Sequence, residues 1–207
     1  MIVLDIETVA SPDVESFLDP VKAPANYKDP EKIAAYRAEK LSDMVARAAL
    51  EPDLCEVLAI GFTLDEGQTI ASKTRESMSE AELITAAWRA IGEHQIVGFN
   101  SLGFDLPVLI RRSQLLGLKF DMPMLDRYRT PHVDLMQKLT FNGALTYRPL
   151  TFYCRRFGLR VPEDDVTGAD IAQLVIDGNW KAIDNHVRSD VAKTTALANR
   201  LGLLPAF

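Results

Sequence analysis

Two carboxylates stand two residues apart near the start of the chain. Asp5 and Glu7 interrupt an apolar, β-branched run that predicts a strand over residues 2–6. Side chains two apart on a strand share a face, so both acids project together. A buried pair of like charges is tolerated when cations neutralise it, and carboxylate oxygens suit Mg²⁺ or Mn²⁺. A strand with one exposed face, or a strand at the edge of the sheet, would account for the spacing equally well.

A third carboxylate follows a later predicted strand at residues 95–99. A short loop containing Gly103 comes next, and Asp105 stands where a helix over residues 106–116 begins, with Pro107 in its first turn. An acid just after a strand can join a metal site. Aspartate also commonly caps a helix, so this position alone leaves both interpretations open.

A histidine and an aspartate stand four apart near the C-terminus. His186 and Asp190 share one face of a helix predicted over residues 183–201, where an imidazole can accept a proton beside an acid. A solvated pair on an exposed helix face is the simpler alternative. His94 and His132 are the other histidines, too few for a zinc hydrolase site, and the pair His132 and Asp134 is interpreted as structural.

The segments that must position these residues alternate between strand and helix patterns. Strands are predicted at residues 2–6, 57–64, 69–73 and 95–99, with a hairpin turn at 65–67. Helices are predicted at residues 79–93, 106–116, 150–157 and 183–201, and residues 133–139 are ambiguous. This order predicts an α/β fold with a mixed β-sheet flanked by helices.

Residues 10–50 form a candidate insertion after the first strand. Residues 10–30 are proline-containing and irregular, and a helix is predicted from Pro30 to about residue 50, with Asp29 as its cap. We expect residues 1–207 to form a single domain that carries this helical insertion. The insertion lies next to the first strand and could cover a site, bind a partner or mediate self-association.

The composition limits the class of protein. The chain has 207 residues, with 29 acidic and 23 basic side chains and a net charge of -6, which argues against a large basic nucleic-acid surface. No apolar run approaches the ~20 residues of a membrane helix, and the N-terminus does not resemble a signal peptide. Cys55 and Cys154 lie far apart and indicate no disulfide framework. We therefore expect a cytoplasmic protein with no membrane partner.

Taken together, the three acidic elements resemble the DEDD 3′–5′ exonuclease superfamily, whose fold is ribonuclease H-like. The matching stretches are Asp5-Ile-Glu7-Thr8, the segment from Phe99-Asn100 through Phe104-Asp105, and His186-x-x-x-Asp190. Within the superfamily the sequence is most similar to the predicted exonucleases related to the proofreading domain of family B DNA polymerases. The resemblance implies an exonuclease domain with a ribonuclease H-like sheet.

The resemblance also implies two-metal hydrolysis of phosphodiesters with Mg²⁺ or Mn²⁺. Asp5 would contact both ions, Glu7 and Asp190 would complete one ion site, and Asp105 would support the other. His186 would orient the attacking water or accept its proton. The sequence departs from the family here. Members with a histidine usually have four residues between the histidine and the aspartate, whereas three residues separate His186 from Asp190.

The implied substrate is the 3′ end of single-stranded DNA, with RNA as an alternative, and the implied products are nucleoside 5′-monophosphates. By resemblance, Thr8 would lie near the terminal 3′ hydroxyl, and Asn100, Leu102 and Phe104 would border the terminal base or sugar. Phe104 could equally be a core residue. Candidate phosphate contacts are Arg111, Arg112, Arg127, Arg129, Arg148, Arg155 and Arg156.

Three alternatives to a DNA exonuclease remain open from the sequence. One is an RNA-directed exonuclease of the same fold, and another is an endonuclease of the ribonuclease H type. The third is a nucleic-acid-binding or interaction module with weak or no catalysis, which the unusual position of His186 would explain. A polymerase or repair partner and self-association are also compatible with the sequence.

Overall fold

A computed structural model describes residues 1–64, 69–126 and 129–204 of the chain. The predicted hairpin turn at 65–67 and Arg127 lie outside these residues. The described strands form one five-stranded sheet in the order β3-β2-β1-β4-β5. Their bounds are Ile2–Ala10 (β1), Cys55–Leu64 (β2), Thr69–Thr74 (β3), Ile96–Gly98 (β4) and Val133–Asp134 (β5).

The central strand β1 joins the antiparallel and parallel parts of the sheet. It pairs antiparallel with β2 and parallel with β4, and β4 in turn pairs parallel with β5. The carboxyl ends of β1, β4 and β5 therefore meet at one edge of the sheet. This edge is where the acids of β1 and the residues that follow β4 converge.

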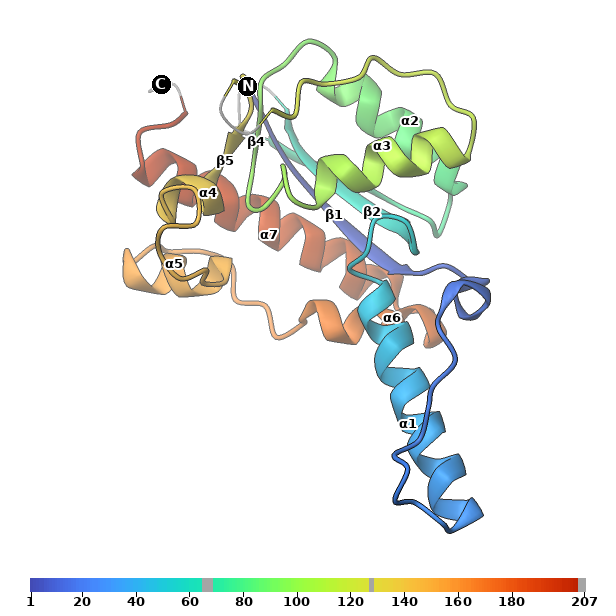
Figure 1. The fold of residues 1–207 in the computed structure, drawn as a ribbon. Coiled ribbons are helices and arrows are strands. Elements are labelled where there is room, and N and C mark those ends of the chain that lie inside the picture. The colour runs from blue at the N-terminus through green and yellow to red at the C-terminus, as the bar shows by residue number, and fades with distance from the viewer. Residues whose placement is uncertain (65–68, 127–128, 205–207) are drawn as a thin grey trace.

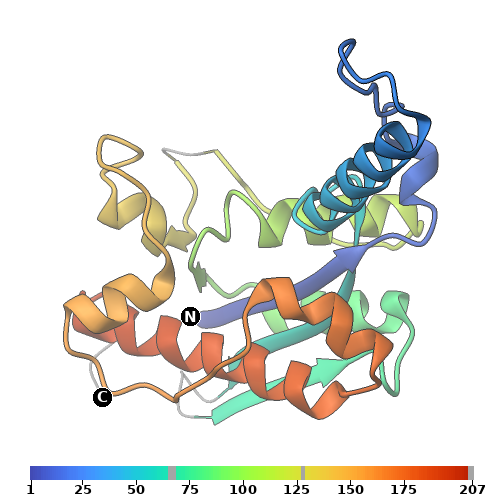
Figure 2. The same ribbon diagram turned by 90° about the horizontal axis from the view of Figure 1, so that it is seen from below.

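Helices cover both faces of the sheet (Figures 1 and 2). One face packs against α2 (Glu80–Ile91) and α3 (Asp105–Leu115), and the other against α7 (Trp180–Arg200), beside α5 (Leu150–Arg156) and α6 (Ile171–Ile176). The remaining helix near the sheet edge is α4 (Leu135–Leu139). The predicted α/β fold with a mixed sheet flanked by helices is confirmed.

Two buried cores reflect the alternation of side chains along β1. Leu4 and Ile6 join the core beneath α2 and α3, whereas Val3 joins the core that contains Val191 of α7. β1 is longer than the predicted strand because its last residues pair with the start of β2 beyond a bulge at Glu7. The bulge lets the strand continue to Ala10 at the edge of the sheet.

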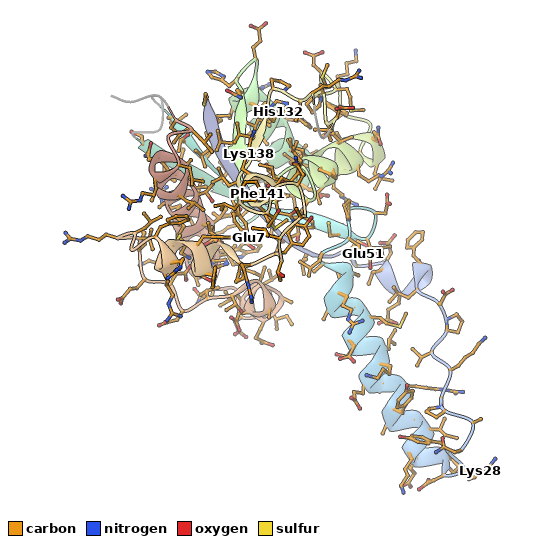
Figure 3. All side chains as sticks on the ribbon, turned by 60° about the vertical axis from the view of Figure 1, so that its left-hand side comes forward. Glu7, Lys28, Glu51, His132, Lys138 and Phe141 are labelled. Atoms are coloured by element: carbon orange, nitrogen blue, oxygen red, sulfur yellow. The ribbon has the colours of Figure 1, made fainter. Side chains whose placement is uncertain are left out.

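Helix α1 (Pro30–Ala48) points away from the sheet (Figures 1 and 3). As predicted, it starts at Pro30 with Asp29 as its cap, and the Asp29 carboxylate accepts the backbone N–H of Glu31 at 3.0 Å. Ala48 is its one buried residue. Within the described part of the chain, every helix is too short or too polar to cross a bilayer.

Candidate metal centre and active site

Asp5 and Glu7 lie on the face of β1 that α7 covers. Their neighbours Leu4 and Ile6 fill the opposite core, so the alternation of the strand turns the two acids towards α7. Glu7 is buried and Asp5 is partly buried. Because β1 lies between β2 and β4, it is not an edge strand, and because α7 covers this face and Glu7 is buried, the alternative of an exposed strand face does not hold either.

A glycine brings α7 close to this part of the sheet. Gly61 of β2 is the register partner of Asp5. A Cβ atom at Gly61 would lie 2.8 Å from a methyl carbon of Val191 and 3.1 Å from the carbonyl oxygen of Val187. The helix therefore rests directly on the sheet, and Asp190, the neighbour of Val191 in sequence, stands beside the acids of β1.

Asp105 reaches the same site through a tightly held loop after β4. The carboxylate of Asp134 accepts the backbone N–H groups of Asn100 and Leu102, each at 3.1 Å, and Asn100 adopts a φ of 64°. The loop then enters α3, whose first residue is Asp105. The cap position is Phe104, and no side chain caps this helix, so the capping interpretation of Asp105 does not hold. Asp105 is almost completely buried.

Helix α7 contributes a histidine held between two acids. His186 Nδ1 lies 2.6 Å from Asp164 Oδ2, and His186 Nε2 lies 3.4 Å from Glu7 Oε1. Lys193 Nζ donates to Asp190 Oδ1 at 2.7 Å and lies 3.6 Å from Asp164 Oδ2. Both His186 and Lys193 are buried, so the alternative of a solvated helix face is excluded.

The carboxylates of this site repel one another in a desolvated environment. Burial raises the pKa of Asp5 well above its usual value, and Asp105, Glu7 and Asp190 raise it further. Burial followed by the charge of Asp190 raises the pKa of Glu7 in the same way. Burial also raises the pKa of Asp105 to about 7. Lys193 opposes the shifts at Asp5 and Glu7 without cancelling them.

Asp164 behaves differently from these acids. Burial alone would raise its pKa, but the hydrogen bond with His186, a backbone hydrogen bond from Val166 and the charge of Lys193 bring the pKa below its usual value. For Lys193, burial favours a lower pKa, and the hydrogen bond to Asp190 reverses this and raises it. Asp164 and Lys193 are therefore both charged, and each has a partner of opposite charge within the site.

The donor set fits hard divalent cations. Five carboxylates surround the site, from Asp5, Glu7, Asp105, Asp164 and Asp190. Among the described residues, one imidazole and one ammonium accompany them. Ligand atoms of Asp164, His186 and Asp190 lie within 4.8 Å of one another. Oxygen-rich coordination of this kind suits Mg²⁺ or Mn²⁺ rather than Zn²⁺.

The residues expected to contact substrate have partners within the protein. The hydroxyl of Thr8 donates to the backbone carbonyl of Ala49 at 2.6 Å, next to the end of α1. Leu102 and Phe104 are partly buried and pack against the core beneath α2 and α3. Asn100 lies in the loop that Asp134 holds.

Two residues of the site, Lys193 and Asp164, were not predicted from the sequence. Lys193 stands three residues after Asp190 and seven after His186, which places it on the same face of α7, so helical periodicity could have identified it. Asp164 lies in the irregular segment between α5 and α6. Its place beside His186 depends on the path of that segment across α7, which no local pattern specifies.

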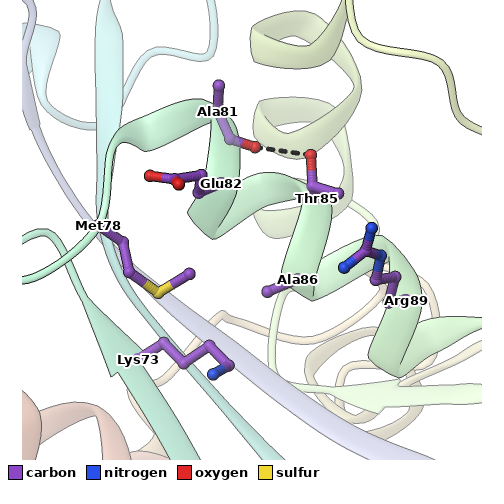
Figure 4. A pocket seen from close by; sticks show the side chains of 7 residues that line it. All are labelled: Lys73, Met78, Ala81, Glu82, Thr85, Ala86 and Arg89. Atoms are coloured by element: carbon purple, nitrogen blue, oxygen red, sulfur yellow. Dashed lines mark hydrogen bonds between the residues drawn. The ribbon is translucent and has the colours of Figure 1, made fainter.

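One hollow of the molecule lies away from these acids. Figure 4 shows this hollow of about 530 Å³ between β3 and α2, lined by Lys73, Met78, Glu82, Arg89 and three small residues. Its single carboxylate, Glu82, is engaged with Ser79 in a capping box at the start of α2. This hollow has no cluster of metal-binding side chains, and the acidic site remains the candidate for chemistry.

Comparisons with known proteins agree with this architecture. The family described as predicted 3′–5′ exonucleases related to the exonuclease domain of PolB matches residues 48–204. An uncharacterised protein of Methanocaldococcus jannaschii is 31% identical over 166 residues, which cover 74% of this chain and 89% of that protein.

A solved structure shows the same fold. The family B DNA polymerase of the hyperthermophilic archaeon Pyrobaculum calidifontis is similar with a TM-score of 0.63 and 18% identity, covering 97% of this chain and 24% of the polymerase chain. This similarity confirms the expected ribonuclease H-like fold. From the family match and the close relative, the chain belongs to the predicted 3′–5′ exonucleases related to the exonuclease domain of PolB.

Proposed function

We propose that the protein is a divalent-metal-dependent 3′–5′ exonuclease that removes nucleoside 5′-monophosphates from single-stranded DNA ends. The observation that carries this proposal is the convergence of Asp5, Glu7, Asp105 and Asp190 in a site where burial and mutual repulsion raise the pKa of the first three. An exonuclease-like fold implies the use of divalent metal. Carboxylates with unbalanced charge are suited to bind it.

The four acids would hold two Mg²⁺ or Mn²⁺ ions. Asp5 would contact both ions, Glu7 and Asp190 would complete one site, and Asp105 would support the other. When bound, such ions activate the attacking water and stabilise the leaving 3′ oxygen. Asp105 is fixed for this role because its loop is anchored by the carboxylate of Asp134.

His186 is oriented to serve the attacking water. Its Nδ1 is engaged by Asp164 at 2.6 Å, so Nε2 is the nitrogen that faces Glu7 and the other acids. A carboxylate partner of this kind fixes the ring and its tautomer. In the metal-free protein, the raised pKa of Glu7, due first to burial, favours a protonated carboxyl facing Nε2. The three-residue spacing to Asp190 keeps both side chains on one helix face.

The proposal is tested with 5′-labelled single-stranded DNA. With Mn²⁺ or Mg²⁺, the wild-type protein should give a descending ladder of products, and Asp5→Ala should abolish it. Asp43→Ala is the matched control, because Asp43 is an exposed acid on α1 that pairs with Lys40. Absence of product from wild type with either metal would contradict the proposal. A circular strand separates an endonuclease, which cleaves circles, from an exonuclease, which needs an end.

The role of His186 has its own test. His186→Ala should lower the hydrolysis rate by about 10²–10⁴-fold while Mn²⁺ binding, measured by calorimetry, is retained. Asp164→Asn should give a smaller loss and a displaced pH profile, because the ring keeps its place but loses a charged partner. Unchanged hydrolysis in His186→Ala would remove the histidine from the mechanism.

A second candidate function is supported by the position of Lys193. Its ammonium lies 2.7 Å from Asp190 and competes with a cation for that carboxylate. If Lys193 takes the place of a metal ion at Asp190, the protein would be a nucleic-acid-binding module without catalysis. In that case titration with Mn²⁺ would show no binding of paired ions, and Lys193→Met would restore it.

A further inference from the structure

One segment of the chain has the opposite charge character from the rest. Residues 135–162 contain five basic side chains and no acid, whereas the rest of the protein contains all 29 acids and 18 of the 23 basic residues. We call residues 135–162 the basic-aromatic segment. Its cations are Lys138, Arg148, Arg155, Arg156 and Arg160.

These cations are available to an external partner. All five are exposed, and none of them forms an ion pair with a carboxylate in residues 1–64, 69–126 or 129–204. Among the described residues outside the segment, some cations are paired with carboxylates, as in Arg112 with Glu80 and Arg75 with Glu56. A concentrated set of unpaired cations on an acidic protein is a local surface for phosphates.

The same segment displays large aromatic side chains. Phe141 is 71% exposed, Tyr147 is 51% exposed and Phe152 is 42% exposed. Exposed aromatic rings interleaved with cations provide stacking surfaces for bases beside contacts for phosphates. Figure 3 labels Lys138 and Phe141 on this part of the molecule.

The loop that presents Phe141 is held in place by its own hydrogen bonds. Phe141 and Asn142 adopt positive φ values of 51° and 58°, which bulky side chains rarely adopt. Thr140 closes the loop, because its hydroxyl accepts the N–H of Gly143 at 3.2 Å and its carbonyl accepts the N–H of Leu145 at 3.0 Å. The exposed ring is therefore displayed by an ordered turn, a form of strain that is often found at functional positions.

One end of the segment contacts the loop that delivers Asp105. A hollow of about 270 Å³ is lined by Phe141 and Lys138 together with Leu102 and Asp134. Asp134 holds the N–H of Leu102, and Asp105 follows three residues later. The hollow therefore adjoins the loop that leads to Asp105.

Helix α5 of the segment contacts the helix that carries Asp190. Cys154 of α5 lies with its Sγ 4.0 Å from the carbonyl oxygen of Lys193, one turn beyond Asp190 on α7. The outer side of α5 carries Phe152, and the guanidinium of Arg148 lies over its ring, 5.4 Å from the centroid. The segment thus adjoins both the loop that leads to Asp105 and the helix that carries Asp190.

We propose that the basic-aromatic segment binds the single strand that leads to the acidic site, with a base stacked on Phe141 and phosphates bound by the exposed cations. This proposal rests on the proposed exonuclease function and deepens it by naming the surface that binds the substrate. Stacking and phosphate contacts are tolerant of sequence, as an enzyme that removes every nucleotide requires.

The stacking part is tested by binding a fluorescein-labelled 12-nucleotide single strand in EDTA, where no hydrolysis occurs. Phe141→Ala should weaken binding by about tenfold or more. Phe17→Ala is the matched control, because Phe17 is 67% exposed and lies outside the segment, and its affinity should equal that of wild type. Equal affinity of Phe141→Ala and wild type would overturn the stacking role.

The phosphate part is tested by the salt dependence of the same binding. Arg148, Arg155 and Arg156 changed together to Gln should lower the slope of log affinity against log salt by about two, since each single-strand phosphate contact contributes roughly 0.7. The matched control changes three exposed cations outside the segment, Arg89, Lys181 and Arg200. An equal slope change in both triple variants would overturn the proposal, and so would binding to phosphatidylserine vesicles in preference to the strand.

A small substrate separates this proposal from the proposed function. The p-nitrophenyl ester of thymidine 5′-monophosphate contains one phosphodiester and needs only the acidic site. Phe141→Ala should hydrolyse it at the wild-type rate with Mn²⁺ while its KM for the 12-nucleotide strand rises about tenfold or more. If wild type cleaves neither substrate, the exonuclease function fails. If wild type cleaves both and Phe141→Ala matches it on both, this proposal alone fails.

Discussion

The protein contains two buried groups of carboxylates that are treated in opposite ways. At the start of α2, the carboxylate of Glu80 accepts two N–H groups of Arg112, at 2.8 and 2.7 Å, and the backbone N–H of Val57 at 2.9 Å. Arg112 also lies 3.6 Å from Glu56, which pairs with Arg75. Here each buried acid has a cation of the protein beside it, and the hydrogen bond to Glu80 raises the pKa of Arg112.

At the edge of the sheet the acids lack such partners. Asp5, Glu7 and Asp105 have raised pKa values because burial is not offset by nearby cations, and Lys193 is shared between Asp190 and Asp164. The same fold can therefore neutralise a buried acid when the acid is structural. Where it does not, the unbalanced charge indicates a place for cations from outside.

The largest difference between the two groups of carboxylates should appear when one acid in each group is neutralised. Glu7→Gln should lower hydrolysis by about 10³-fold or more, because an ion ligand is lost. The same change should raise the melting temperature of the metal-free protein, because a glutamine needs neither a buried charge nor the uptake of a proton on folding. Glu80→Gln should instead lower the melting temperature with metal binding retained. Melting curves in EDTA measure both, and a lower melting temperature for Glu7→Gln would contradict the distinction.

Removing Arg112, the cation that pairs with Glu80, tests the role of the cation in the paired group. Arg112→Met should destabilise the fold by about 3–5 kcal/mol, because Glu80 would remain buried without its partner. Urea unfolding measures the loss. Arg111→Met is the matched control, since Arg111 pairs with Asp53 at the exposed surface and should contribute at most about 1 kcal/mol. A small effect at Arg112 would mean that the pair is not what keeps Glu80 buried.

The pH dependence of stability distinguishes the two groups further. The pKa of Asp105 rises from its ordinary 3.8 to about 7 on folding, mainly through burial. Its protonated form favours the fold, so this contribution is complete below pH 3.8 and is lost as the pH rises to about 7. Asp105→Asn should remove a loss on the order of 4 kcal/mol across that window in metal-free protein. Parallel stability curves for Asp105→Asn and wild type between these pH values would refute the assignment.

The smallest expected effect concerns the glycine that seats α7. Gly61→Ala should destabilise the fold by about 1–3 kcal/mol, because the new methyl group meets Val191 and the backbone of Val187. It should also weaken Mn²⁺ binding by moving Asp190 away from Asp5. Gly168→Ala is the control, since a Cβ there meets no atom within 4 Å. Calorimetric Mn²⁺ affinity equal to wild type would show that the site tolerates this displacement.

The sequence predicted those parts of the site that follow from local periodicity. The period of two along a strand placed Asp5 and Glu7 together, and the period of a helix placed His186 with Asp190. The helix that begins at Pro30 was predicted for the same reason. Each of these features depends on residues within a few positions of one another.

Contacts between distant segments could not be predicted in this way. Arg112 was among the candidate phosphate contacts, and the structure instead pairs it with Glu80, which lies 32 residues earlier in the chain. The partnership of Asp164 with His186 spans 22 residues and an irregular connection. Such contacts are set by how elements pack, which a single sequence records only indirectly.

Two hydrogen bonds join the start and the end of the insertion, residues 10–50, that contains α1. Ser11 N–H donates to the carbonyl of Leu54 at 2.8 Å, and Thr8 binds the carbonyl of Ala49, so the chain leaves and re-enters the sheet at one place. Lengthening such a loop costs only about 0.6 kcal/mol per doubling. Changes in the insertion should therefore have little effect on the sheet that holds the acids. Its helix α1, which is roughly 28 Å long, can vary in length or sequence while the acids keep their positions.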